Sequence, residues 1–79
     1  MKNFAVVRLA NKSDGTLAAP VSGFDTETEA WKEFFRLCGG AVDSQHPMDT
    51  VVLVTKEGFT LDSRCFDHTK NAPDDDANG

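Results

Sequence analysis

The chain has 79 residues, and its 8 Lys and Arg residues stand against 13 Asp and Glu residues, which gives a formal net charge of −5 at pH 7. A chain this short forms one small domain with a thin core, which excludes an interdomain catalytic cleft, a barrel enzyme and a doubly wound nucleotide-binding fold. The acidic balance argues against non-specific binding to duplex DNA, because such binding depends on Lys and Arg to neutralise phosphates.

The cysteine content and the N-terminal residues predict where the protein works. Cys38 and Cys65 are its two cysteines, fewer than a small secreted domain usually carries. The N-terminus has no hydrophobic signal segment. No apolar run approaches the roughly 18 residues that a membrane-spanning helix needs. We therefore predict a cytoplasmic protein with reduced thiols and no membrane partner.

Two strands are predicted at the N-terminal end of the chain. Residues 4–10 are apolar at both alternating positions, which is typical of a strand buried, or nearly buried, on both faces. Turn-forming residues occupy positions 11–15, and residues 16–22 then form a weaker strand. Because Pro20 has no N–H to donate to a neighbouring strand, we expect this second strand at an edge of the sheet.

Residues 25–38 are predicted to form the helix. Thr26 followed by Glu29 fits a capping box, in which each side chain bonds the backbone of the other residue. Apolar side chains then repeat on one helix face, namely Ala30, Trp31, Phe34, Phe35, Leu37 and Cys38. Gly39 and Gly40 are expected to end the helix, because glycine readily adopts the left-handed conformation of a C-cap.

Two further strands follow, and together the elements define the fold class. Residues 51–55 and 59–66 read as strands joined by a short turn at Glu57 and Gly58. The order β-β-α-β-β predicts an α+β fold of two layers. Its layers are a four-stranded antiparallel sheet and one helix that covers one face.

The C-terminal end of the chain differs in composition from the rest. It is polar and contains Pro73 and three consecutive aspartates. Segments of this kind bury too little apolar surface to fold. We therefore predict that residues 1–70 form a single domain and that residues 71–79 form a disordered acidic tail.

The sheet face that the helix leaves uncovered is the main candidate for a binding surface. If the strand phases of the basic residues point away from the helix, this face carries Arg8, Lys56, Arg64 and Phe66. Such a surface binds single-stranded nucleic acid, because bases stack on aromatic rings while cations follow the phosphates. The alternatives are a homodimer or another protein contact through this face, or a face that is simply solvated.

A metal site and a cysteine nucleophile are weaker candidates. Cys38, His46, Cys65 and His68 supply the ligand types of a zinc site. Cys38, however, falls on the apolar helix face, where a free cysteine behaves as a small hydrophobe. Cys65 near His68 and Asp67 has the residue types of a nucleophilic site, but no glycine-rich turn supplies an oxyanion hole. We predict no metal, no cofactor, no small-molecule substrate and no enzyme activity.

The segment His46-Pro47-Met48-Asp49 precedes the third predicted strand. It reads as a turn in which the Asp49 carboxylate accepts a backbone N–H at the start of the strand. The alternative is a role in recognition.

Several short motifs occur in a characteristic order. They are Met1-Lys2-Asn3-Phe4-Ala5-Val6, Ala19-Pro20-Val21, Thr26 with Glu29-Ala30, Phe34-Phe35, His46-Pro47-Met48-Asp49, residues 51–54 and Gly58-Phe59. In this order, over residues 1–66, they resemble the small non-structural protein of gokushovirus-type microviruses, which are single-stranded DNA phages that include the chlamydia phages. The chain departs from that family in lacking Tyr, in its Gly39-Gly40 pair, and in having Thr50 and Thr60 where an aromatic residue and Asp are usual.

The resemblance implies a phage-encoded protein that is absent from the virion and works in the cytoplasm of the infected bacterium. It also implies a function in single-stranded DNA replication or in control of single-strand synthesis. The protein would act there by weak single-strand binding or by contact with replication proteins. The alternative is an acidic module that binds and inhibits a host defence or replication factor. Either function allows a homodimer through the open sheet face or an edge strand.

Overall fold

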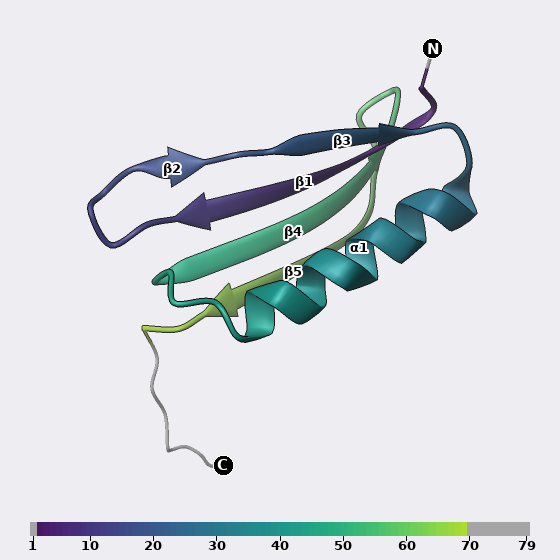
Figure 1. Cartoon of the computed structure of the whole chain (residues 1–79). Helices are drawn as coiled ribbons and strands as arrows, with labels where there is room; N and C mark the ends of the chain where they lie inside the picture. Colours follow the sequence, from purple (N-terminus) through teal and green to yellow (C-terminus); the bar gives the residue numbers. More distant parts are fainter. Residues whose placement is uncertain (1, 70–79) are drawn as a thin grey trace.

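The computed structural model describes residues 2–69 and contains one helix and one sheet (Figure 1). The elements are β1 (Phe4–Asn11), β2 (Leu17–Ala18), β3 (Val21–Phe24), α1 (Glu27–Val42), β4 (Met48–Thr55) and β5 (Thr60–Asp67). The acidic tail predicted for residues 71–79 lies outside the described residues.

All strands pair in antiparallel fashion and form a single sheet. β1 and β4 are its central strands; β5 pairs with β4, and both β2 and β3 pair with the far side of β1. α1 lies across one face of this sheet (Figure 1). The predicted α+β fold, with one helix on one face of an antiparallel sheet, is confirmed. The strand count is five because the predicted second strand is divided.

The division of that strand falls at Ala19 and Pro20, between β2 and β3. Pro20 cannot donate to β1, but its carbonyl oxygen accepts the N–H of Arg8 at 3.1 Å, so the two segments stay beside β1. The predicted edge position of Pro20 is confirmed. In the preceding turn the N–H of Lys12 bonds the carbonyl of Thr16 at 2.9 Å, and Gly15 provides the positive φ of 89°.

The core lies between α1 and the two central strands. The register places Val6 of β1 opposite Leu53 of β4 beneath the helix. The fully buried apolar residues are Val6, Ala30, Phe34, Ala41, Val51 and Leu53. On the opposite face of β1, Val7 and Leu9 are only half-buried. β1 is therefore fully buried on one face and half-buried on the other, because α1 covers only one face of the sheet.

The predicted N-cap of the helix is confirmed, and the helix ends later than predicted. Thr26 is the N-cap, and its hydroxyl oxygen accepts the N–H of Glu29 at 3.3 Å. The prediction that Gly39 and Gly40 end the helix is wrong, since α1 continues to Val42. The additional turn carries Ala41 into the core, where it is fully buried. Tertiary burial thus overrides the low helix propensity of the two glycines.

Replacing Gly39 with alanine should stabilise the protein. Gly39 has no positive φ, is exposed, and leaves open space around an added Cβ. We expect the free energy of unfolding to rise by about 0.5–1 kcal/mol, because alanine loses less backbone entropy in a helix. Gly58→Ala has equally open space but a φ of +95°, so it should lower stability. Urea denaturation measures both variants, and a Gly39→Ala protein no more stable than wild type would contradict the prediction.

Candidate functional site

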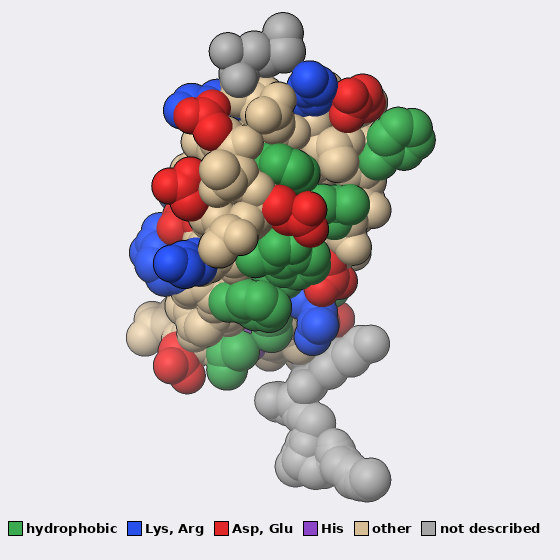
Figure 2. Space-filling model, turned by 90° about the vertical axis from the view of Figure 1, so that its right-hand side faces the viewer, with side chains coloured by type: hydrophobic (Ala, Val, Ile, Leu, Met, Phe, Trp, Pro, Cys, Tyr) green, Lys and Arg blue, Asp and Glu red, His purple; other side chains and the backbone are tan. Residues whose placement is uncertain are grey.

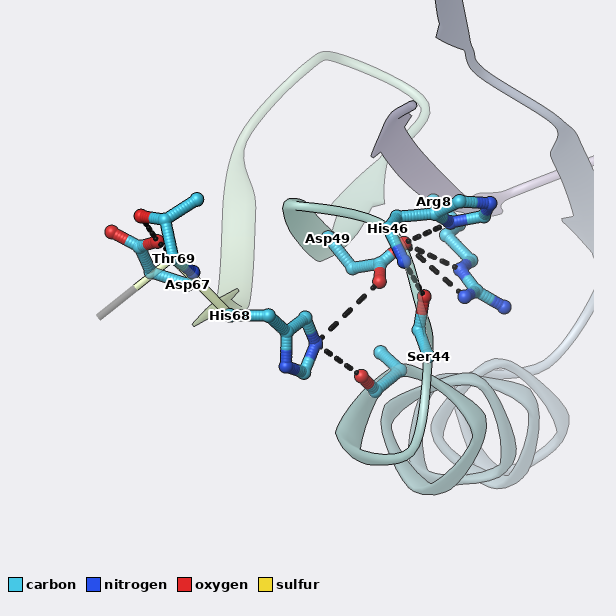
Figure 3. A network of polar contacts seen from close by, with 8 residues as sticks. Arg8, Ser44, His46, Asp49, Asp67, His68 and Thr69 are labelled. Atoms are coloured by element: carbon cyan, nitrogen blue, oxygen red, sulfur yellow. Dashed lines mark hydrogen bonds and ion pairs between the residues drawn. The ribbon is translucent and has the colours of Figure 1, made fainter. Parts of the chain in front are cut away.

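The most connected polar group in the described residues is the carboxylate of Asp49, at the start of β4. Asp49 is fully buried, and the register places it beneath the helix, opposite Ala10 of β1. Figure 3 shows this carboxylate between Arg8 and His46 on one side and His68 on the other. A buried carboxylate is costly unless cations and hydrogen-bond donors surround it.

One oxygen of this carboxylate carries almost all of the contacts. Oδ1 accepts bonds from Arg8, whose Nε lies at 3.3 Å and whose Nη2 lies at 3.2 Å. Nδ1 of His46 lies 3.2 Å from the same oxygen and donates when its proton is on that nitrogen. Oδ2 accepts no hydrogen bond from the described residues, and Nε2 of His68 lies 3.8 Å from it. That nitrogen is engaged with the carbonyl oxygen of Ala41 at 2.8 Å.

These surroundings change the pKa of the Asp49 carboxyl. Burial raises the pKa of the carboxyl, but hydrogen bonds from Ser44, His46 and Arg8 and the charge of Arg8 outweigh burial. The net effect lowers the pKa below its ordinary value of 3.8. Asp49 therefore stays ionised at neutral pH and holds Arg8 in place.

The cluster joins four parts of the fold that are distant in sequence. Arg8 comes from β1, His46 from the connection after α1, Asp49 from β4, and His68 from the segment after β5. The Ser44 hydroxyl accepts the backbone N–H of His46 at 3.0 Å, so this serine is bound to the main chain next to the ring. The arrangement positions the α1–β4 connection against the sheet, which is a structural task.

Arg8 does not lie where the single-strand binding hypothesis requires it. Its strand phase is that of Val6, so its side chain projects beneath the helix. Its Nη1 lies 3.7 Å from the position of a Cβ added at Gly40 of α1. The side chain is mostly buried and is paired with Asp49. The single-strand binding hypothesis required the side chain of Arg8 to point away from the helix. In the structure it points towards the helix, so this part of the prediction is wrong.

Of the other predicted binding residues, Arg64 and Phe66 also lie away from the open face, and Lys56 lies beyond the end of β4. The register sets Arg64 and Phe66 of β5 opposite Val51 and Asp49, on the helix side of the sheet. Phe66 packs against the core, whereas Arg64 is largely exposed and lies 3.5 Å from Asp62. Lys56 is exposed in the β4–β5 turn, and its backbone N–H bonds the carbonyl of Asn3. The structure therefore does not bring the four residues together on one surface.

The candidate metal ligands and nucleophile are likewise separated by the sheet. Cys38 lies on α1, and Cys65 pairs with Thr50 in the phase that faces away from the helix. His68 contacts Ala41 on the helix side, so it does not face Cys65. Within residues 2–69, no group of three or more His, Cys, Asp or Glu side chains is arranged to hold a metal ion.

The face opposite α1 is apolar and uncharged along its centre. Its side chains, placed by the register, are Ala5, Val7, Leu9, Asn11, Leu17, Val21, Met48, Thr50, Val52, Val54, Thr60, Ser63, Cys65 and, at one end, Asp67. Val21, Val7, Val52 and Ser63 form one row that crosses four strands. Val21, at the end of this row, is 62% exposed. Another apolar surface could cover this central row without removing water from an ionised group.

Sequence reasoning missed the role of Asp49 and the composition of the open face. It assigned Asp49 a local bond at the start of a strand, whereas the carboxylate bonds the side chain of Arg8, 41 positions away in the sequence. The signal for the open face was present in the alternate residues of β4, where Val52 and Val54 share one phase. Only the structure shows that the other phase of β4, with Val51 and Leu53, faces the helix.

Neither family models nor curated proteins nor solved structures yield a match to this chain. Among residues 2–69, no helix has the length and apolar character required to cross a membrane.

Proposed function

We propose that the protein is a non-enzymatic binding module that holds an apolar surface of another protein against its open sheet face. The observation that carries this proposal is the uncharged row of Val21, Val7 and Val52 across the sheet. Sheets in globular proteins bury an apolar face against a second layer of structure. Among residues 2–69, α1 supplies such a layer on one face and leaves the other face open (Figure 1).

The dimensions of the face suit an amphipathic helix of the partner. The face is as long as the eight residues of β4 and as wide as four neighbouring strands, which corresponds to roughly 27 by 19 Å. A helix is about 10 Å wide, and about 18 helical residues span 27 Å. One such helix would lie along the centre of the face and form a third layer.

The charges of the predicted DNA-binding residues support protein contact over nucleic-acid contact. Arg8 is bound to Asp49 beneath the helix, so it does not present its charge to a phosphate on the open face. Arg64 projects on the helix side of β5 and Lys56 lies in a turn. The resemblance to the microvirus protein supports a partner among the proteins of single-stranded DNA synthesis, either a phage replication protein or a host factor in the bacterial cytoplasm.

Val21→Asp tests this proposal against Val42→Asp as a matched control. Both valines are exposed, by 62% and 56% respectively, but Val21 lies on the open face and Val42 on α1. A partner identified by cross-linking in expressing cells is purified and titrated with each variant. We expect Val21→Asp to weaken binding at least tenfold, because it places a charge in an apolar contact. Val42→Asp should bind like wild type, and added salt should have little effect.

The competing hypothesis, direct contact with single-stranded DNA, is tested with a labelled oligonucleotide. Salt-sensitive binding of this probe that is lost on Lys56→Ala with Arg64→Ala would overturn the proposal in favour of direct DNA contact. Partner binding that Val21→Asp leaves unchanged would overturn the assignment of the open face.

A further inference from the structure

The two edges of the sheet differ in how they are protected. One edge is formed by β2 and β3, which have 2 and 4 residues and are separated by Pro20. Short strands and proline are common devices that prevent an edge from pairing with another chain. The other edge is β5, which has 8 residues, TLDSRCFD, with neither proline nor lysine. β5 has one irregularity, a bulge at Leu61 where its register with β4 shifts. The segment from Asp62 to Asp67 is regularly paired with β4 and can pair further on its other side.

The backbone of β5 offers hydrogen-bonding groups along this edge. The N–H of His68 bonds the carbonyl of Pro47 at 2.8 Å, on the β4 side. Since N–H directions alternate along a strand, those of Phe66 and Arg64 also point towards β4, and those of Cys65 and Ser63 point outward. The N–H of Ser63 accordingly bonds a side chain, the Asp62 carboxylate at 2.8 Å. A second strand can replace this local bond.

The charges on β5 make the edge complementary to itself in one register. We propose that two copies of the chain pair through β5 in antiparallel fashion about a twofold axis at Ser63. This register places Asp62 of each copy opposite Arg64 of the second copy, on the helix side. Registers centred on Asp62 or Arg64 would instead place like charges opposite each other, which destabilises a strand pair. The proposal does not depend on the proposed function, which uses the open face.

The flank of α1 that faces β5 supports the same pairing. Cys38 on this flank is near β5: burial raises the pKa of its thiol, and the charges of Arg64 and Asp62 act on it as well. Phe35 and Val42 on the same flank are 59% and 56% exposed, and Phe35 stacks on Trp31 at a centroid distance of 5.6 Å. Figure 2 shows hydrophobic side chains gathered in a band between charged side chains.

Pairing through β5 would bury part of this band. A twofold axis perpendicular to the sheet keeps both helices on the same side of the joined sheet. The apolar flanks of the two α1 helices then face each other across the paired β5 strands. Strand hydrogen bonds and the burial of Phe35 and Val42 therefore act together, and a second copy is the occupant that supplies both.

Ser63→Cys tests the register directly. The cysteines of the two copies would be opposite each other in a hydrogen-bonded pair, about 5.5 Å apart at Cα, within the range that a disulfide bridges. In a Cys38→Ala, Cys65→Ser background, mild oxidation with diamide should convert most of the protein to a covalent dimer. Ser22→Cys in the same background is the matched control, since Ser22 is an exposed serine on edge strand β3. Failure of Ser63→Cys to cross-link, or equal cross-linking of Ser22→Cys, overturns the register.

Charge exchange tests the association without a covalent bond. Arg64→Asp should weaken dimerisation about tenfold or more in sedimentation equilibrium, because two opposite-charge pairs become like-charge pairs. Asp62→Arg combined with Arg64→Asp should restore it. Arg36→Asp, on the exposed face of α1 next to Glu33, makes the same change in net charge and should have no effect.

Three outcomes of the sedimentation experiment would overturn the proposal. A wild-type chain that is monomeric up to its solubility limit excludes the dimer. A dimer that Arg64→Asp leaves unchanged excludes the β5 register. A dimer that is lost on Val21→Asp but not on Arg64→Asp assigns the contact to the open face. Loss of partner binding on Val21→Asp with an intact dimer would support both proposals separately.

Discussion

The Asp49→Asn variant should lose about 2–3 kcal/mol of its free energy of unfolding. The substitution removes the charge that Arg8 and His46 surround, and it leaves the mostly buried guanidinium of Arg8 without an anionic partner. Because small domains are stable by only about 5–15 kcal/mol, the loss is a large fraction of the total. Urea denaturation at neutral pH measures it.

A surface ion pair provides the control for this substitution. Asp25 lies 3.4 Å from Lys2, and both side chains are 62% exposed. Solvent screens such a pair, so Asp25→Asn should cost less than about 1 kcal/mol. Equal losses for Asp49→Asn and Asp25→Asn would show that the buried cluster contributes no more than an exposed pair, contrary to our expectation.

The same variant should change how stability depends on pH. The pKa of Asp49 is lowered in the folded protein, so between this lowered pKa and 3.8 the unfolded chain binds more protons than the folded one. The stabilisation is therefore fully present above pH 3.8 and is lost as the pH falls through the lowered pKa. The unfolding free energy of the wild type should fall more steeply below pH 3.8 than that of Asp49→Asn. Parallel curves would contradict the lowered pKa.

Phe34→Ala should have the largest effect on stability, a loss of about 3–5 kcal/mol. Phe34 is the largest fully buried side chain and packs against Trp31 and Phe35 with edge-to-face geometry. Its removal leaves a cavity between α1 and the central strands, and a thin core has few other side chains that could fill it. Thermal and urea unfolding would show the loss as a lower midpoint.

The neighbouring Phe35 is the matched control for Phe34. It is the same residue type on the same helix but 59% exposed. Phe35→Ala should therefore cost less than about 1 kcal/mol, the range typical of positions outside the core. It should instead weaken the association through β5, since Phe35 lies on the flank that this pairing would bury. Similar unfolding midpoints for Phe34→Ala and Phe35→Ala would contradict the position assigned to the core.

Local signals in the sequence determined the elements and their order. Thr26 and Glu29 define the helix start because capping involves residues three apart in the chain. Gly58, with its φ of +95°, marks the β4–β5 turn for an equally local reason. Pro20 placed its strand at an edge because the missing N–H belongs to the residue itself. From these features the α+β fold with one helix on one sheet face could be predicted.

Other features depended on contacts between distant segments, and the tertiary structure alone decided them. Local propensity favoured a helix end at Gly39, but burial of Ala41 extends the helix. β1 is apolar in both phases, so its sequence does not distinguish the covered face from the open one. The partner that allows Arg8 to lie beneath the helix is Asp49 on another strand. A buried charge is stable only where the fold places an opposite charge beside it. The register between β1 and β4 places Asp49 beside Arg8, and local sequence does not determine that register.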